Sequence, residues 1–385
     1  MKQPIILIVG ICFLFCFNGC EKESESESKQ SSGIKNLKLS GSDCESFVRL
    51  ISGPHFEEFN DIIQTNDGGY AFCGYTNTEA ESEKDILIVK TDCYGKTEWM
   101  QKVSNEHSDY GKSIIQLSTG DYLISATYME NQLVAHGNSQ SAQLIKIAEN
   151  GELLWKRDED SHVSNQEIRK TKDENLLLFS SYENGDYTLK KITPSGNELW
   201  KKTYEIVGTI TDVKVYDNGE IMLSGSSSDS IVLTKLSRQG DTIWVKKSAR
   251  GNSMGLVVSD SSIFVNSEQR KSNTEFEYFI SKFDFKGDLV WQKPLEEFGV
   301  NTSNLITKTH DNHLLIVFNY STGLKFLKLN SIDATVLNET QLNLPNSFFK
   351  DLISTDDNGF ILCGRNRISL GNSEGLVVKT DQYGN

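Results

Sequence analysis

Short apolar runs separated by polar turns repeat along most of the chain, and their apolar spacing is that of strands rather than helices. One kind of run ends in a lysine, as in "ILIVK", which closes at Lys90. The lysines that close such runs are Lys90, Lys146, Lys191, Lys235, Lys282, Lys328 and Lys379. Their spacings of 56, 45, 44, 47, 46 and 51 residues indicate an internal repeat.

A glycine and then a tryptophan follow most of these lysines at fixed distances. The glycine lies five residues after the lysine in six of the seven copies, and Asp333 replaces it in the other. The tryptophan comes four residues later still, at Trp99, Trp155, Trp200, Trp244 and Trp291, whereas the sixth copy has Leu337. We predict that the glycine makes a turn and that the tryptophan begins an outer strand and packs between neighbouring sheets. Five equivalent positions favour packing over the alternative that these rings are sugar-stacking platforms.

The upstream half of each unit reads as a β-hairpin. In "DIIQTNDGGYAFCGY" two strand-like runs flank a turn rich in Asp, Asn and Gly, which accept a positive φ. Each unit therefore has four strands. Units of about 45 residues with four strands are typical of β-propeller blades, because stacking around an axis covers both faces of each sheet. The sequence predicts an all-β, seven-bladed β-propeller of four-stranded antiparallel blades over residues 46–385.

The last unit lacks a fourth strand, because the given sequence ends just after Gly384. Residues 47–70 align without a gap on residues 99–122, so that Phe47 stands at the tryptophan position. We therefore expect residues 46–52 to be an outer strand that pairs beside residues 372–380, completes the last blade and closes the ring.

The N-terminus has the pattern of an export signal. Residues 1–19 hold one lysine and a short apolar run that ends in "FNG", directly before Cys20. This resembles the bacterial lipoprotein signal, which implies lipidation of Cys20; the alternative is an ordinary cleaved signal. Residues 20–45 begin with alternating Glu and Ser, which favours a solvated tether. The acidic stretch also resembles the surface-export tag of Bacteroidetes lipoproteins, which implies an outer-membrane protein exposed at the cell surface, with a periplasm-facing anchor as the alternative.

The repeat over residues 46–385 also resembles the propeller repeats of exported Bacteroidetes proteins, most of which have no assigned activity. The segment "DCYGKTEW" ending at Trp99 is similar, more faintly, to the tryptophan-docking repeat of quinoprotein-like propellers, which include redox enzymes and an outer-membrane assembly lipoprotein. The distance from Asp to Gly is one residue shorter here, and those proteins usually have eight units. No matching cofactor motif is present, so we predict no cofactor.

The net charge and the cysteine pattern limit the kinds of ligand and site that this chain is expected to have. The formal net charge of −14 argues against nucleic acid and against an electrostatic membrane patch. Four cysteines lie beyond Cys20: Cys44, Cys73, Cys93 and Cys363. None stands in a zinc-binding pattern, so we predict no metal. Cys73 and Cys363 occupy equivalent positions in blades that become neighbours on closure, and we expect buried thiols there, with a disulfide as the alternative.

Candidate binding residues lie where long loops are expected, on the face opposite the tight hairpin turns. Tyr128, Tyr182 and Tyr320 recur at one position near the end of the second strand, and Tyr75 lies next to it. If they ring the central opening, they form an aromatic rim suited to a glycan or peptide; alternatively, tyrosine is simply a good strand residue. The segment "GNSMG", 251–255, matches a nucleophile motif, but we place it in a loop between blades and expect a chance match.

The sequence thus favours a lipid-anchored, monomeric propeller that acts as a non-catalytic binding or scaffold module for an envelope protein or glycan. It would contact the membrane only through its N-terminal lipid. The alternative is a polysaccharide-active enzyme with carboxylates in the central channel, and quinoprotein-like redox chemistry or an outer-membrane assembly role is a poorer third. A carboxylate pair about 5 to 9 Å apart among aromatic side chains would favour the hydrolase.

Overall fold

The computed structural model describes residues 45–385 apart from 54–55, 78–82, 106–107, 130–139, 183–184, 205–207, 260, 273–274, 296–303, 321 and 370. Every regular element in these residues is a strand, from β1 to β28, so the predicted all-β fold is confirmed. The described part of the chain contains no helix long and apolar enough to cross a membrane. Cys20 and Cys44 lie outside the described residues.

Five separate antiparallel sheets have four strands each, paired in chain order. The first contains β6 (Asp109–Gln116), β7 (Tyr122–Met129), β8 (Gln140–Ile147) and β9 (Leu153–Ser161). The second contains β10 (Val163–Lys170), β11 (Leu176–Tyr182), β12 (Tyr187–Ile192) and β13 (Glu198–Tyr204). The third contains β14 (Thr209–Val215), β15 (Ile221–Ser227), β16 (Ser230–Leu236) and β17 (Thr242–Arg250). The fourth contains β18 (Asn252–Val258), β19 (Ile263–Arg270), β20 (Phe276–Phe283) and β21 (Leu289–Leu295). The fifth is β22 (Asn304–Lys308), β23 (Leu314–Tyr320), β24 (Gly323–Leu329), β25 (Val336–Asn343).

An eight-stranded sheet joins the two ends of the described chain. One half is β2 (Phe56–Gln64), β3 (Tyr70–Asn77), β4 (Asp85–Thr91) and β5 (Thr97–Val103). The other half is β26 (Ser347–Ser354), β27 (Phe360–Ser369), β28 (Asn372–Thr380) and β1 (Phe47–Ile51). The β1 strand pairs antiparallel with β28, with Phe47 opposite Lys379, so the predicted pairing of residues 46–52 is present. A single parallel bridge between Phe56 and Ser373 connects the halves.

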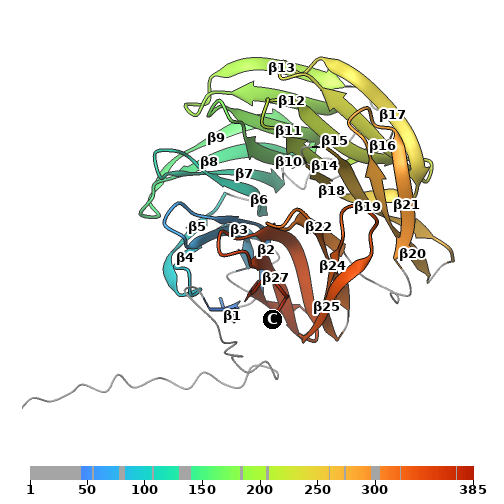
Figure 1. The fold of residues 1–385 in the computed structure, drawn as a ribbon. Helices are drawn as coiled ribbons and strands as arrows, with labels where there is room; N and C mark the ends of the chain where they lie inside the picture. The colour runs from blue at the N-terminus through green and yellow to red at the C-terminus, as the bar shows by residue number, and fades with distance from the viewer. Residues whose placement is uncertain are drawn as a thin grey trace, which may run out of the picture. The chain divides into compact units, whose positions relative to one another are not determined.

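The first strands of successive sheets contact one another in a series that returns to its start. The order is β2, β6, β10, β14, β18, β22 and β26, and β26 contacts β2. Figure 1 shows β6, β10 and β14 at the inner side of their sheets, with β9, β13 and β17 outside. Because each sheet is covered by neighbours on both sides, its second and third strands are almost entirely buried.

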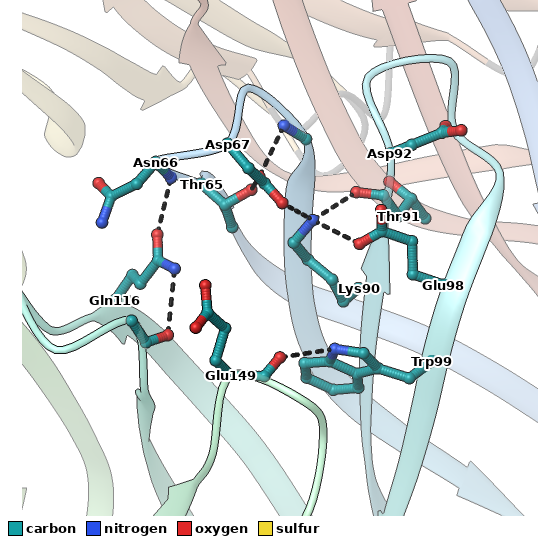
Figure 2. A network of polar contacts seen from close by, with 12 residues as sticks. Thr65, Asn66, Asp67, Lys90, Thr91, Asp92, Glu98, Trp99, Gln116 and Glu149 are labelled. Carbon is teal, nitrogen blue, oxygen red and sulfur yellow. Dashed lines mark hydrogen bonds and ion pairs between the residues drawn. The ribbon is translucent and has the colours of Figure 1, made fainter.

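The tryptophans pack against the next sheet, as predicted for these positions. Trp99 Nε1 donates to the Glu149 carbonyl at 3.0 Å (Figure 2). The ring covers Gly151, whose φ is 89°, and a Cβ there would lie 2.7 Å from the indole. Gly151 is therefore required both by its backbone conformation and by the contact.

A buried lysine in the third strand pairs with an acid in the hairpin turn of its own sheet, a contact that the sequence reasoning missed. Lys90 is 2% exposed and donates to Asp67 and Glu98, each at 2.8 Å (Figure 2). The same pairing recurs as Lys146–Asp121, Lys191–Asp173, Lys235–Glu220, Lys328–Asp311 and Lys379–Asp357. Lys282 instead donates to the Ser331 carbonyl at 3.0 Å. The recurring lysine therefore holds the hairpin turn onto the third strand.

Candidate functional site

A channel runs between the first strands and is lined from every member of the series β2, β6, β10, β14, β18, β22 and β26. Toward the hairpin turns it opens into a cavity of about 340 Å³. Its walls there are mainly aliphatic, with Ile63, Ile115, Val257 and Ile353 as examples. This end of the channel offers an apolar surface.

The other end of the channel is polar, with a cavity of about 180 Å³. Its charged lining residues are Asp61, Lys112, Glu167, Arg169, Asp212, Lys214, Lys350 and Asp351. Arg169 pairs with Glu167 at 2.8 Å, and Lys214 with Asp212 at 3.2 Å. Burial, with the nearby Lys350 charge, lowers the pKa of Lys112. This end of the channel therefore holds both cations and carboxylates, which come from β2, β6, β10, β14 and β26.

The channel carboxylates tie neighbouring sheets together. Asp61, Asp212 and Asp351 each follow an irregularity in a first strand, and each accepts a backbone hydrogen bond from the next strand in the series. Asp61 accepts from Ile114 N–H at 2.7 Å, and Asp351 accepts from Ile62 N–H at 3.2 Å. These acids satisfy backbone donors of the neighbouring first strands.

Asp61 holds its proton to higher pH than an ordinary aspartate. Burial raises the pKa of Asp61 well above its ordinary value, and the Asp351 charge adds to the shift. A side-chain hydrogen bond to Asp351 raises this pKa further, because Asp61 can donate that bond only when it is protonated. The two carboxyl groups lie at the junction of β2 and β26.

This pair lacks the arrangement of a glycoside hydrolase. Such enzymes hold their carboxyl groups roughly 5 to 9.5 Å apart, with sugar between them. Here the two groups bond directly to each other, and each also holds a backbone amide. The residues that line the two described cavities of the channel include no aromatic side chain for a sugar ring to stack on. The channel geometry therefore gives the hydrolase alternative no support.

An aromatic and cationic group lies at the strand ends away from the hairpin turns. This mouth cluster consists of Phe56, Tyr75, Lys84, Tyr110, Phe348 and Arg365. The rings of Phe56 and Tyr75 stack with centroids 5.6 Å apart, and Tyr110 meets Tyr75 edge-on at 5.2 Å. Lys84 Nζ lies 4.4 Å from the Tyr75 centroid and 4.8 Å from that of Tyr110. Cation–π contacts therefore hold the lysine over the rings.

The mouth cluster connects to the polar end of the channel. Arg365 lies over the rings of Phe56 and Phe348, and it pairs with the buried Glu58 at 3.0 Å. Lys350, which lines the channel, pairs with the same Glu58 at 3.2 Å. Phe348 is 41% exposed, so solvent reaches this group. Cations therefore extend from the channel to the surface.

The four predicted tyrosines lie at or near the ends of the second strands of four different sheets. Tyr75 joins the mouth cluster, together with Tyr110, which the sequence reasoning missed. Tyr182 donates to Asp160 of the outer strand β9 at 2.9 Å, and Tyr320 lines a hollow with Gln341 of the outer strand β25. None of the four lies among the lining residues of the two channel cavities. Binding of a ligand by Tyr75, Tyr128, Tyr182 and Tyr320 stays a prediction.

Two other sequence features have structural explanations. Cys73 and Cys363 are buried free thiols, and burial raises the pKa of each. The segment 251–255 lies largely within strand β18, and not in a loop as expected; Ser253 is buried and donates to Ser224 Oγ at 3.1 Å. Among the described residues no group of three or more His, Cys, Asp or Glu could hold a metal ion.

No protein-family model and no curated protein matches the chain. Several solved structures of other proteins do match it. Virginiamycin B lyase from Staphylococcus aureus is 10% identical, with a TM-score of 0.53 over 89% of this chain and 98% of that one. BBS1N, solved in complex with ARL6DN, is 10% identical, with a TM-score of 0.53 over 91% of this chain and 99% of that one. A protein of unknown function from Bacteroides caccae is 15% identical, with a TM-score of 0.40 over 66% of this chain and 96% of that one.

The fold is of the β-propeller type. At this level of identity the likeness concerns the fold alone. A propeller-type fold provides a rigid scaffold whose loops and channel ends are open to binding.

Proposed function

We propose that this chain is a lipid-anchored cell-envelope protein whose seven-bladed propeller is a non-catalytic binding or scaffold module for a protein or glycan. The pairing of β1 with β28 and the returning series of first strands support seven blades and ring closure. The signal, the Cys20 lipid and the acidic tether rest on the sequence pattern of residues 1–45.

The mouth cluster is the observation that carries the binding role. The chain has a net charge of −14, yet Lys84 and Arg365 lie over aromatic rings here, and Lys350 pairs nearby with Glu58. A local positive region in an acidic protein draws anions toward it, while the rings offer flat contact area. The favoured ligand is therefore an acidic glycan or an acidic segment of an envelope protein.

The binding role is tested with a glycan array and with pull-down from envelope extract, using protein that lacks the signal. We expect capture of an acidic ligand, and loss of most of that capture in Lys84→Gln and Phe348→Ala. Lys172→Gln is the matched control, since Lys172 is an exposed lysine on the hairpin-turn side. Capture that survives both cluster variants, or degradation of a polysaccharide without capture, refutes the proposal.

The anchor is tested separately with Cys20→Ser. We expect the wild-type chain to incorporate labelled fatty acid and to fractionate with membranes, and the variant to do neither. Digestion of intact cells with an added protease distinguishes surface exposure from a periplasm-facing anchor. A variant that still fractionates with membranes contradicts lipid anchoring through Cys20.

A further inference from the structure

A second hollow, of about 560 Å³, lies on the hairpin-turn side, between the sheets that begin with β14 and β18. Its lining residues are Val215, Tyr216, Asp217, Asn218, Glu220, Lys235, Val258, Ser259, Phe285 and Lys308. This volume is within the range of small-molecule sites, roughly 300 to 1,000 Å³. The mouth cluster contributes no residue to it.

A contact that joins sheets at two other junctions is missing at this hollow. At those junctions a glutamine that ends a first strand accepts from the turn of the preceding sheet: Gln116 accepts from Asn66 N–H at 2.8 Å (Figure 2), and Gln64 accepts from Asp356 N–H at 2.9 Å. Val258 stands at the equivalent position and offers no side-chain acceptor. The turn after it, closed by Ser259 N–H to the Ser262 carbonyl, is one residue shorter than the Thr65–Gly69 turn. Both differences leave space between the sheets.

Two aromatic rings line this space. Tyr216 stands where four other turns have a threonine, and its ring lies 5.8 Å from that of Phe285, centroid to centroid. Lys235 Nζ, paired with Glu220 at 2.9 Å, lies 5.7 Å from each ring centroid and fixes both. The Tyr216 hydroxyl is buried and has no hydrogen-bond partner among the described residues. Such an orphaned hydroxyl calls for a partner that carries polar groups.

An unpaired cation completes the site. Lys308 lies at the rim of this hollow and of the apolar end of the channel. The equivalent Lys170 pairs with Glu174 at 2.8 Å, but Asn312 replaces that acid in the turn after Lys308. No carboxylate of the described residues pairs with Lys308 within 4.0 Å. A ligand with one negative charge would supply the missing partner.

We propose that this hollow binds a sugar acid, that is, a pyranose ring bearing a carboxylate. The ring packs on Tyr216 and Phe285, its carboxylate pairs with Lys308, and its hydroxyl groups meet the polar rim of Asp217, Asn218 and Ser259. This site is independent of the mouth cluster and of the function proposed for it, because the two share no residue.

The test is calorimetric titration of the purified protein with glucuronate and, as the neutral counterpart, glucose. We expect glucuronate to bind about tenfold or more tightly than glucose. Lys308→Met should reduce glucuronate binding to the level of glucose, while Lys286→Met, an exposed lysine beside Phe285, should leave it unchanged.

Val258→Gln tests the same hollow with a variant that should fold well. It installs the glutamine found at the equivalent positions of β2 and β6, so we expect a stable protein that has lost glucuronate binding. The proposal is wrong if the wild type binds no glucuronate at millimolar concentration, if glucose binds equally well, or if Lys308→Met or Val258→Gln binds glucuronate as the wild type does. Mouth variants that abolish envelope capture but spare glucuronate binding separate the two sites.

Discussion

Phe47 covers Gly95 in the same way that Trp99 covers Gly151. A Cβ at Gly95 would lie 2.6 Å from the Phe47 ring, and a Cβ at Gly151 would lie 2.7 Å from the indole. Phe47 belongs to β1, paired with β28, while Gly95 lies between β4 and β5. The N-terminal strand therefore makes the contact with the other half of the eight-stranded sheet that an outer strand makes with the next sheet elsewhere.

Filling Gly95 should disturb this contact. Gly95→Ala adds a methyl group against Phe47 and also strains a backbone with φ of 76°. Gly68→Ala is the matched control, because Gly68 has φ of 84° but no atom within 4 Å of an added Cβ. We expect Gly95→Ala to lose about 1–3 kcal/mol more than Gly68→Ala in urea unfolding, the usual range for overpacking. Equal losses would mean that only the backbone conformation matters.

Removing the Phe47 ring should weaken the junction of the chain ends. Phe47 is 4% exposed, and truncation of a buried Phe costs about 3–5 kcal/mol. Leu337, at the tryptophan position of the sixth unit, is 47% exposed, so Leu337→Ala should cost about 0.5 kcal/mol or less. Denaturant midpoints of Phe47→Ala and Leu337→Ala measure the difference. A small loss for Phe47→Ala would show that β1 contributes little to closure.

Stability should depend on the proton that Asp61 retains in the folded state. Because the folded pKa of Asp61 is raised, the folded state keeps this proton where the unfolded chain has lost it. The stabilisation is full below the unfolded pKa, near 3.9, and is lost as pH rises through the folded pKa. Asp109, whose pKa is raised to about 6, contributes in the same direction.

Asp61→Asn isolates the Asp61 contribution, since an amide can donate to Asp351 and accept from Ile114 N–H without titrating. We expect this variant to be the more stable protein at about pH 8, by about 1 kcal/mol or more, and to show a flatter decline from about pH 4. Thermal unfolding of both proteins across that range provides the comparison. Identical pH profiles would contradict a raised pKa of Asp61.

The buried lysines should differ in their dependence on the turn acid. Lys379 is 1% exposed and pairs only with Asp357 among the described acids, whereas Lys90 pairs with both Asp67 and Glu98. We expect Asp357→Ala to cost about 1–3 kcal/mol, less than the roughly 3–5 kcal/mol for breaking a fully buried pair because Asp357 is partly exposed. Asp67→Ala should cost less, since Glu98 keeps Lys90 paired.

Both acids accept the same two hydrogen bonds within their turns, from a threonine hydroxyl and a glycine amide. The difference in unfolding free energy between Asp357→Ala and Asp67→Ala therefore reports on the lysine alone. Urea unfolding at neutral pH measures it, and a larger loss for Asp67→Ala would refute the explanation.

Much of the fold was predictable because its signals are local and repeated. Alternating apolar residues, the glycine turns and the tryptophan spacing predicted all-β units of four strands, and the match of Phe47 to Trp99 predicted the pairing of β1 with β28. The segment 251–255 was placed wrongly because the apolar pattern marks only the later part of the first strand, whereas β18 begins at Asn252, before its apolar run from Leu256.

The candidate sites were less accessible to sequence reasoning. Tyr75 was singled out, but its partners Phe56, Tyr110 and Arg365 come from three different strands, and no short spacing relates them. Asp61 and Asp351 stand at equivalent repeat positions, a signal that could have marked them. Their direct hydrogen bond, however, depends on which strands become neighbours.

The sequence by itself determined the strand content, the turn positions, the packing role of the tryptophans and the place of the N-terminal strand. These depend on backbone preferences and on side-chain alternation within one unit. Tertiary structure decided which lysines are neutralised, which carboxyl group has a raised pKa and where a hollow opens between sheets. Such properties arise from distances between side chains of different units, and the free energy of a buried charge or an unfilled space depends on those distances.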